Sequence, residues 1–194
     1  MGRPKAGEPS ARERILDAAF RLFYRHGVRG VGIDRVIAES GVAKATLYKH
    51  FASKDDLVLA YLDQVDQQWF DALHAAARSA GEAPRDQLLG MFDAVVDACS
   101  VEGFHGCAFI NTAIESVPGS VVHTRAVEHK DQVRGWATDL AKRAGAADAE
   151  ELARQLMVLM NGVLAGGGLD GDVRDSYVAK SAAEALIAGA LPAR

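Results

Sequence analysis

The spacing of apolar residues near the start of the chain predicts three helices. A capping-box pattern at Ser10 and Glu13 opens an apolar repeat at helical spacing, which ends at Gly27. Two short amphipathic segments follow, over residues 33–40 and 44–51. Helices of about eight residues are not stable alone, so we expect both to pack on the first helix and form a three-helix unit.

The rest of the chain also reads as helices. Further helical segments are predicted over residues 53–78, 84–99, 107–116, 120–144, 150–165 and 173–189. Gly or Pro residues interrupt the pattern between most of them, and no segment alternates with the period of a strand. The predicted fold class is therefore all-α, with an N-terminal three-helix bundle in residues 1–52 and a larger helical domain in residues 53–194.

Composition and charge narrow the class of protein. Hydrophobic residues make up 49% of the chain, which excludes global disorder. Residues 1–54 hold eleven Lys and Arg against five acidic residues, a net charge of +6, while the remainder has a net charge of −10. A basic first quarter on an acidic body indicates a polyanionic partner for that quarter, with a solvated basic helix surface as the alternative.

Segments that would direct the chain to a membrane or out of the cell are not evident. The N-terminal residues contain no apolar core of a signal peptide, and the longest apolar stretch, 156–169, is too short to span a bilayer. Two cysteines are too few for a disulfide framework. We expect a protein of the reducing cytoplasm with no membrane association.

The two short segments around Gly41 have the pattern of a helix-turn-helix, whose second helix enters the major groove of DNA. The candidate DNA contacts are the polar or small residues of that helix and its surroundings: Lys44, Ala45, Thr46, Tyr48, Lys49, His50 and Lys54. Arg3 and Lys5 in the N-terminal arm are further candidates, either in the minor groove or as part of a solubilising tail. A small basic domain that docks a protein is the alternative for the whole unit.

A longer motif supports the DNA-binding interpretation. Residues 27–57 contain Gly-Val-x-Lys-x-Thr-Leu-Tyr-x-His-Phe-x-x-Lys, and this stretch closely resembles the helix-turn-helix of the TetR family of bacterial transcriptional repressors. The resemblance implies that Lys44 to Thr46 begin the recognition helix and that Tyr48, His50 and Lys54 hold phosphates. At Gly32 and Ala43 the family commonly or often has Thr and Ser, so two hydroxyl contacts are in doubt.

The resemblance also implies a role for the helical body: dimerisation through its last two helices and binding of a small effector among the others. The expected partners are thus a double-stranded DNA operator, a second copy of the chain, and a hydrophobic or aromatic effector. Candidate ligand-binding residues are Trp69, Phe92, Phe104, Cys107, Phe109, Asn111, Glu115, Met157, Met160 and Asn161. Candidate dimer-interface residues are Leu152, Leu156, Leu159, Val163, Val178, Ala182, Ala185 and Leu186. Ordinary core packing is the alternative for these apolar side chains.

The cysteines and histidines offer alternative chemistry. Cys99 and Cys107 invite a redox or metal-responsive repressor, with His105 and His123 as further ligands, but their spacing matches no common zinc pattern. Buried, inert cysteines are the simpler interpretation. No nucleophile, phosphate-binding or dinucleotide motif is present, so we expect no enzyme, cofactor or metal. A helical ligand carrier that does not bind DNA is the remaining alternative.

Overall fold

The computed structural model describes residues 9–166 and 172–192, and these residues form helices and no strands. The helices are α1 (Ala11–His26), α2 (Ile33–Ser40), α3 (Lys44–His50), α4 (Lys54–Ala80), α5 (Pro84–Ser100), α6 (Ala108–Glu115), α7 (Val121–Arg143), α8 (Ala149–Gly166) and α9 (Arg174–Ala190). The predicted all-α fold class is confirmed, and each predicted segment corresponds to one helix. Arg3 and Lys5 lie outside the described residues.

The chain divides into two compact units. The first contains the residues up to Val65 together with 111–126, and the second contains 66–110 and the residues from Val127 onward. The first unit extends beyond the boundary expected at residue 52 because the start of α4 packs on α1. The ring of Tyr61 on α4 lies edge-on to Phe20 and Phe23 of α1, with centroid distances of 5.5 and 5.7 Å.

A capping box determines where α1 begins. The hydroxyl of Ser10 accepts a hydrogen bond from the Glu13 amide at 3.2 Å, and the Glu13 carboxylate accepts one from the Ser10 amide at 2.7 Å. These bonds hold the pKa of Glu13 below its usual value, and the bond from the Ser10 backbone amide has the largest effect. The helix ends at Gly27, whose positive φ of 74° is readily adopted only by glycine.

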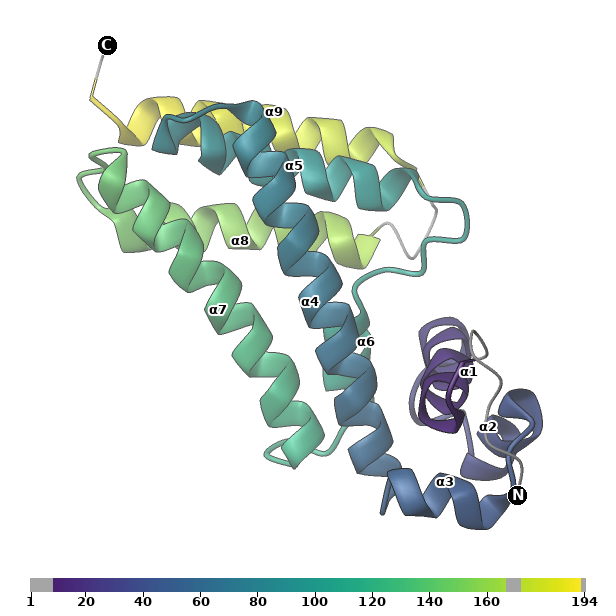
Figure 1. The fold of residues 1–194 in the computed structure, drawn as a ribbon. Coiled ribbons are helices and arrows are strands. Elements are labelled where there is room, and N and C mark those ends of the chain that lie inside the picture. The colour runs from purple at the N-terminus through teal and green to yellow at the C-terminus, as the bar shows by residue number, and fades with distance from the viewer. Residues whose placement is uncertain (1–8, 167–171, 193–194) are drawn as a thin grey trace. The chain divides into compact units, whose positions relative to one another are not determined.

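The two short helices pack on α1, as their length requires (Figure 1). Val36 of α2 and Leu47 of α3 are fully buried, and Phe51, which follows α3, is 4% exposed. Between the helices, Gly41 adopts the left-handed conformation and donates its amide to the Ile37 carbonyl at 3.1 Å. The chain can therefore start α3 only a few residues after α2 ends.

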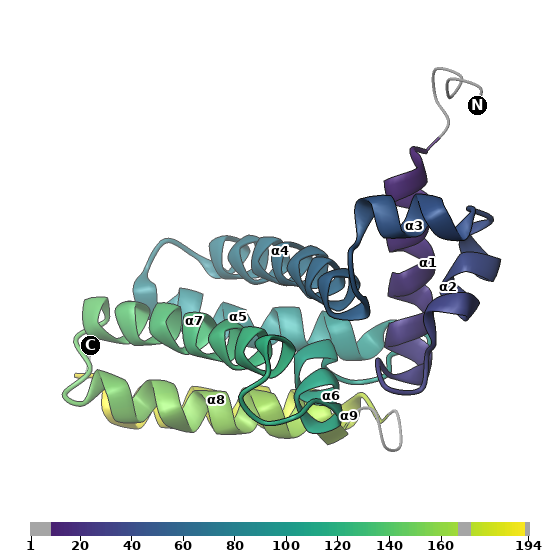
Figure 2. The ribbon, with the colours of Figure 1, turned by 90° about the horizontal axis from the view of Figure 1, so that it is seen from below.

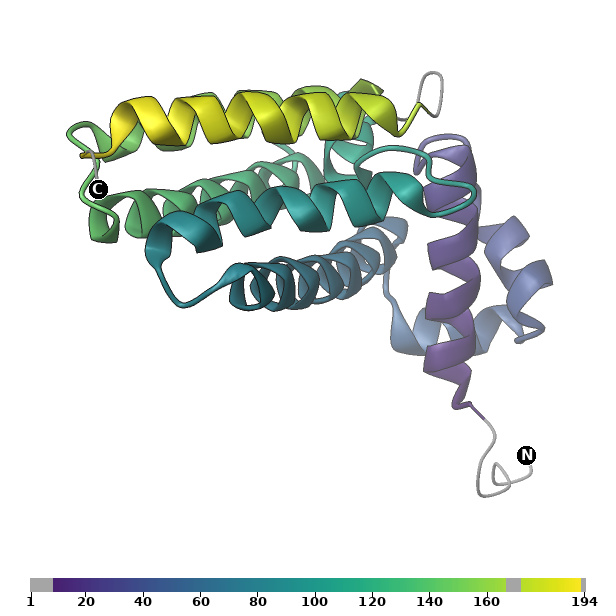
Figure 3. The same ribbon diagram turned by 90° about the horizontal axis from the view of Figure 1, so that it is seen from above.

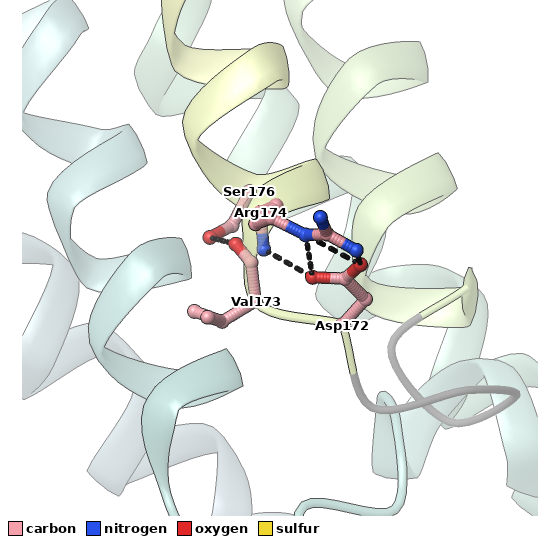
Figure 4. A network of polar contacts seen from close by, with 4 residues as sticks. All are labelled: Asp172, Val173, Arg174 and Ser176. Atoms are coloured by element: carbon pink, nitrogen blue, oxygen red, sulfur yellow. Dashed lines mark hydrogen bonds and ion pairs between the residues drawn. The ribbon is translucent and has the colours of Figure 1, made fainter.

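In the second unit, α9 packs along both α5 and α8 (Figures 2 and 3). The core between the helices of this unit is built from aliphatic side chains, methionines and Phe92. Where α5 meets α4, Gly90 allows close contact, because a Cβ at this position would lie 2.9 Å from the backbone of Ala76 and Ala77. At the start of α9, the Asp172 carboxylate accepts hydrogen bonds from the backbone amide and guanidinium of Arg174 (Figure 4).

Within residues 9–166 and 172–192, none of the helices combines the length and apolar character that crossing a membrane requires.

Candidate nucleic-acid interface

The packing of α3 determines which of its side chains face solvent. Leu47 points into the core of the first unit with no exposure, so the opposite side of this short helix is open. Ala45, Tyr48 and Lys49 are exposed on that side, Lys44 and His50 are exposed at the two ends of the helix, and Thr46 is half-buried. An exposed helix with amine, hydroxyl, imidazole and small apolar groups has the chemistry that contacts to base edges and phosphates require.

Two residues of this surface have contacts that bear on DNA binding. The Lys44 amine lies 3.3 Å from the Asp34 carboxylate, but both side chains are well exposed, at 64% and 86%. Such a pair contributes little to stability and can open when a phosphate or base competes. Tyr48 is 44% exposed, which is high for a large aromatic residue.

The N-terminus of α4 is occupied by its own cap. The Ser53 amide and hydroxyl both donate to the Asp56 carboxylate at 2.9 Å, and the Asp56 amide donates to the Ser53 hydroxyl at 3.1 Å. This arrangement uses the amides of Ser53 and Asp56 at the helix start, and acidic groups lie in the first turn, where they disfavour a phosphate. The contact expected here therefore depends on the amine of Lys54, which is half-buried, rather than on the helix terminus.

At the two positions where the sequence departs from the TetR pattern, the helices have no side-chain cap. Gly32 precedes α2 and Ala43 precedes α3, and neither supplies a side-chain cap. The sequence reasoning missed Arg12, whose guanidinium lies 5.4 Å above the ring of Phe51. This cation–π contact connects the beginning of α1 to the end of α3 and keeps a positive charge next to the exposed helix.

The candidate ligand-binding residues are divided between the two units. Asn111 and Glu115 lie in the first unit, and the other eight lie in the second. Phe92, Phe109 and Met160 are at most 2% exposed and belong to the second unit's core. Met157 is also buried, whereas the remaining four are half-buried: Trp69, Phe104, Cys107 and Asn161.

Glu115 has a partner within the first unit. Its carboxylate accepts a hydrogen bond from the backbone amide of Arg29 at 2.6 Å, in the loop between α1 and α2. A Cβ at Gly27 would lie 2.1 Å from the same carboxylate, so the glycine leaves the space that Glu115 occupies. In this structure Glu115 therefore connects α6 to the end of α1.

A buried polar cluster in the second unit was not predicted. His129 on α7 is 1% exposed, pairs with the Asp66 carboxylate of α4, and stacks on Phe109 with a centroid distance of 3.6 Å. Phe70 lies edge-on to the same imidazole at 5.8 Å. The signal that would have found His129 is its helical spacing from Val133 and other buried residues of α7.

Asn161, which was predicted to contact a ligand, accepts a hydrogen bond from Lys130 at 2.9 Å.

Cys99 and Cys107 are both free and half-buried. Burial raises the pKa of the Cys99 thiol, which lowers its thiolate fraction and its reactivity at neutral pH. Over the part of the chain that the structure describes, no group of three or more His, Cys, Asp and Glu side chains is arranged to hold a metal ion.

The predicted dimer residues do not all reach the surface. Leu152 and Leu156 are each 2% exposed and belong to the core, because their side of α8 packs within the chain. Val178 is 66% exposed, Ala185 is also exposed, and Leu159, Val163, Ala182 and Leu186 are half-buried. Two further apolar or aromatic side chains on these helices, Val158 and Tyr177, are 67% and 57% exposed and were not among the predicted residues.

Comparisons with known proteins agree with this architecture. Residues 15–61 match the profile of the bacterial regulatory proteins of the TetR family. The HTH-type transcriptional repressor ComR of Escherichia coli strain K12 is 30% identical over 146 residues, which cover 73% of this chain and 68% of ComR. The crystal structure of a TetR-family transcriptional regulator from Streptomyces coelicolor has a TM-score of 0.87 at 37% identity, over 93% of this chain and 95% of that chain. A structure from Streptomyces avermitilis has a TM-score of 0.82 at 30% identity, over 94% and 98%.

The chain has a helix-turn-helix unit followed by an all-helical body, and transcriptional regulators match it over most of its length. It is therefore a transcriptional regulator rather than an enzyme. The chain belongs to the TetR family. The resemblance read from the motif around Gly41 is thereby confirmed.

Proposed function

We propose that this TetR-family regulator binds a palindromic double-stranded DNA operator as a homodimer, represses transcription there, and is released by a small effector. The observation that carries the proposal is the exposed polar side of α3, opposite the fully buried Leu47. A helix held by its apolar side against a three-helix core presents its other side rigidly to a groove.

The residues of that side divide into two kinds of contact. Lys44, Ala45 and Thr46 begin the helix, and their amine, methyl and hydroxyl groups suit base edges in the major groove. Tyr48, His50 and Lys54 offer donors for phosphates, which orient the helix and supply salt-dependent affinity. Lys49 is also exposed and contributes positive charge.

Exposed apolar and aromatic side chains on α8 and α9 support the homodimer. Val158, Tyr177 and Val178 are each more than half exposed, and together they would cost free energy if left in water. A two-helix contact from each of two copies forms a four-helix interface with twofold symmetry, which matches a palindromic operator.

The effector is proposed to be hydrophobic or aromatic, since the candidate ligand-binding residues of the second unit are predominantly aromatic or sulfur-containing. As a regulator of bacterial transcription, the protein would act in the cytoplasm, where the chromosome lies.

The DNA contacts are tested by selecting bound duplexes from a random pool and then measuring affinity for the recovered site at several salt concentrations. The Lys54→Ala variant should bind more weakly to all sequences alike, with a salt slope reduced by about one. Lys142→Ala, which removes the same charge from an exposed site on α7, is the matched control. Recovery of no palindrome, or equal slopes for the two variants, would contradict the proposed interface.

The dimer is tested by sedimentation of Val178→Asp, which places a charge in the proposed interface. We expect dissociation to monomers and a loss of operator binding, because a monomer has a single helix-turn-helix and makes only half of the DNA contacts. Val127→Asp introduces the same charge at a valine of α7 that is 42% exposed and should leave the dimer intact. A dimer of unchanged stability in Val178→Asp would rule out this surface.

A further inference from the structure

A groove lies between α4 and α5 in the second unit. It has a volume of about 580 Å³, and the residues that line it include Trp69, Ala72 and Ala76 of α4, Asp93 and Asp97 of α5, and Val101, which follows α5. At Gly90 the two helices are in backbone contact. Along the rest of the groove both helices present mainly alanine, and alanine side chains are too short to fill the space between the helices.

The groove combines an apolar floor with an aromatic wall. Its apolar lining is accessible to solvent, and Val101 is 63% exposed. The indole of Trp69 is half-buried and packs against the core with one part while another part lines the groove. Covering this surface with the apolar body of a ligand removes it from water and is favourable in proportion to the area buried.

The charge of the groove is acidic. Asp93 and Asp97 are four residues apart on α5 and therefore lie on the same side of the helix. Asp93 pairs with Lys180 of α9, whereas Asp97 is exposed and has no ion-pair partner among the residues that the structure describes. No Lys or Arg is among the described residues that line the groove. An anion would meet repulsion here, and a cation would meet carboxylates beside an aromatic side chain.

We propose that this groove binds an organic cation with an apolar, aromatic body. The body occupies the alanine floor, the charge is balanced by Asp97, and Trp69 adds a cation–π contact. Binding follows from the groove alone; its consequence for the operator rests on the proposed function, because α4 is the helix that continues from the DNA-binding unit.

The test is calorimetric titration of the full chain, without DNA, with tetraphenylphosphonium and with tetraphenylborate. These ions have nearly the same size and shape and opposite charges, so apolar burial is matched and the sign of the charge is isolated. We expect the phosphonium to bind at least about tenfold more tightly than the borate. Equal affinities, or tighter binding of the borate, would overturn the proposal.

Two variants locate the site. Asp97→Asn should weaken phosphonium binding by about threefold to tenfold, while Glu128→Gln, which removes the same charge from an exposed position on α7, should not. Ala72→Phe places a ring in the groove and should abolish binding with an unchanged circular dichroism spectrum. If Asp97→Asn and Glu128→Gln weaken binding equally, or Ala72→Phe binds as the parent does, the groove is not the site. Failure of operator binding would not change any of these results, since no DNA is present.

Discussion

Replacing Gly90 with alanine isolates the contact that brings α4 and α5 together. A Cβ at this position would lie 2.7 Å from the Cβ of Ala80, 2.9 Å from the carbonyl oxygen of Ala76 and 2.9 Å from the Cα of Ala77. Carbon atoms in favourable contact are about 3.5–4.0 Å apart. Two of the three neighbours are backbone atoms and cannot rotate away, so the helices must separate.

Two opposing terms determine the magnitude. Alanine is favoured over glycine inside a helix by about 1 kcal/mol. Overpacking a well-packed contact by one methyl group costs about 1–3 kcal/mol. With backbone atoms on the other side, we expect the upper part of that range and a net loss of about 1–2 kcal/mol. For a chain of this size, the loss corresponds to a fall in Tm of about 3–6 °C.

The assay is thermal unfolding followed by circular dichroism at one protein concentration, since a dimer makes Tm depend on concentration. Gly135→Ala is the matched control, because Gly135 is an exposed residue in the interior of α7 and a Cβ there meets nothing within 4 Å. This variant should gain about 0.5–1 kcal/mol from helix propensity alone. If Gly90→Ala is as stable as the parent or more stable, the helices tolerate separation and the reasoning from close contact is refuted.

Three further predictions concern polar groups. Glu115→Gln should lower the free energy of unfolding by about 1 kcal/mol in urea titrations, because a neutral amide oxygen is a weaker acceptor for the Arg29 amide; an unchanged value would mean that this bond is not formed in solution. Hydrogen bonds from Arg174 lower the pKa of Asp172 to about 2, so its contribution to stability is complete above the ordinary aspartate pKa of about 3.9 and is lost as the pH falls toward 2. Carboxyl chemical shifts of Asp172 that titrate near pH 4 would contradict this. Because burial raises the pKa of the Cys99 thiol, its alkylation rate should continue to increase above about pH 8.5, and a plateau below that pH would be evidence against burial.

The sequence by itself determined the helices and the nature of the DNA-binding unit. Helix ends are local, since a capping box at Ser10 and a left-handed glycine at Gly41 act within a few residues of the chain. The apolar repeat likewise shows which side of α3 is buried, and so which side is available to DNA. These features depend on neighbours three or four residues apart, which the sequence displays directly.

Tertiary structure decided which residues of different helices meet. Leu152 and Leu156 have the same apolar character as surface residues of α8 and α9, and only the packing of α8 shows that they are buried. Glu115 had a polar pattern that fitted a ligand site, yet it lies against the loop after α1. His129 has the helical spacing of the buried residues of α7, but its stacking on Phe109 follows from a contact between helices that this spacing does not specify. Such contacts join positions far apart in the chain, and their geometry depends on how the helices cross, which hydrophobic periodicity along one helix does not specify.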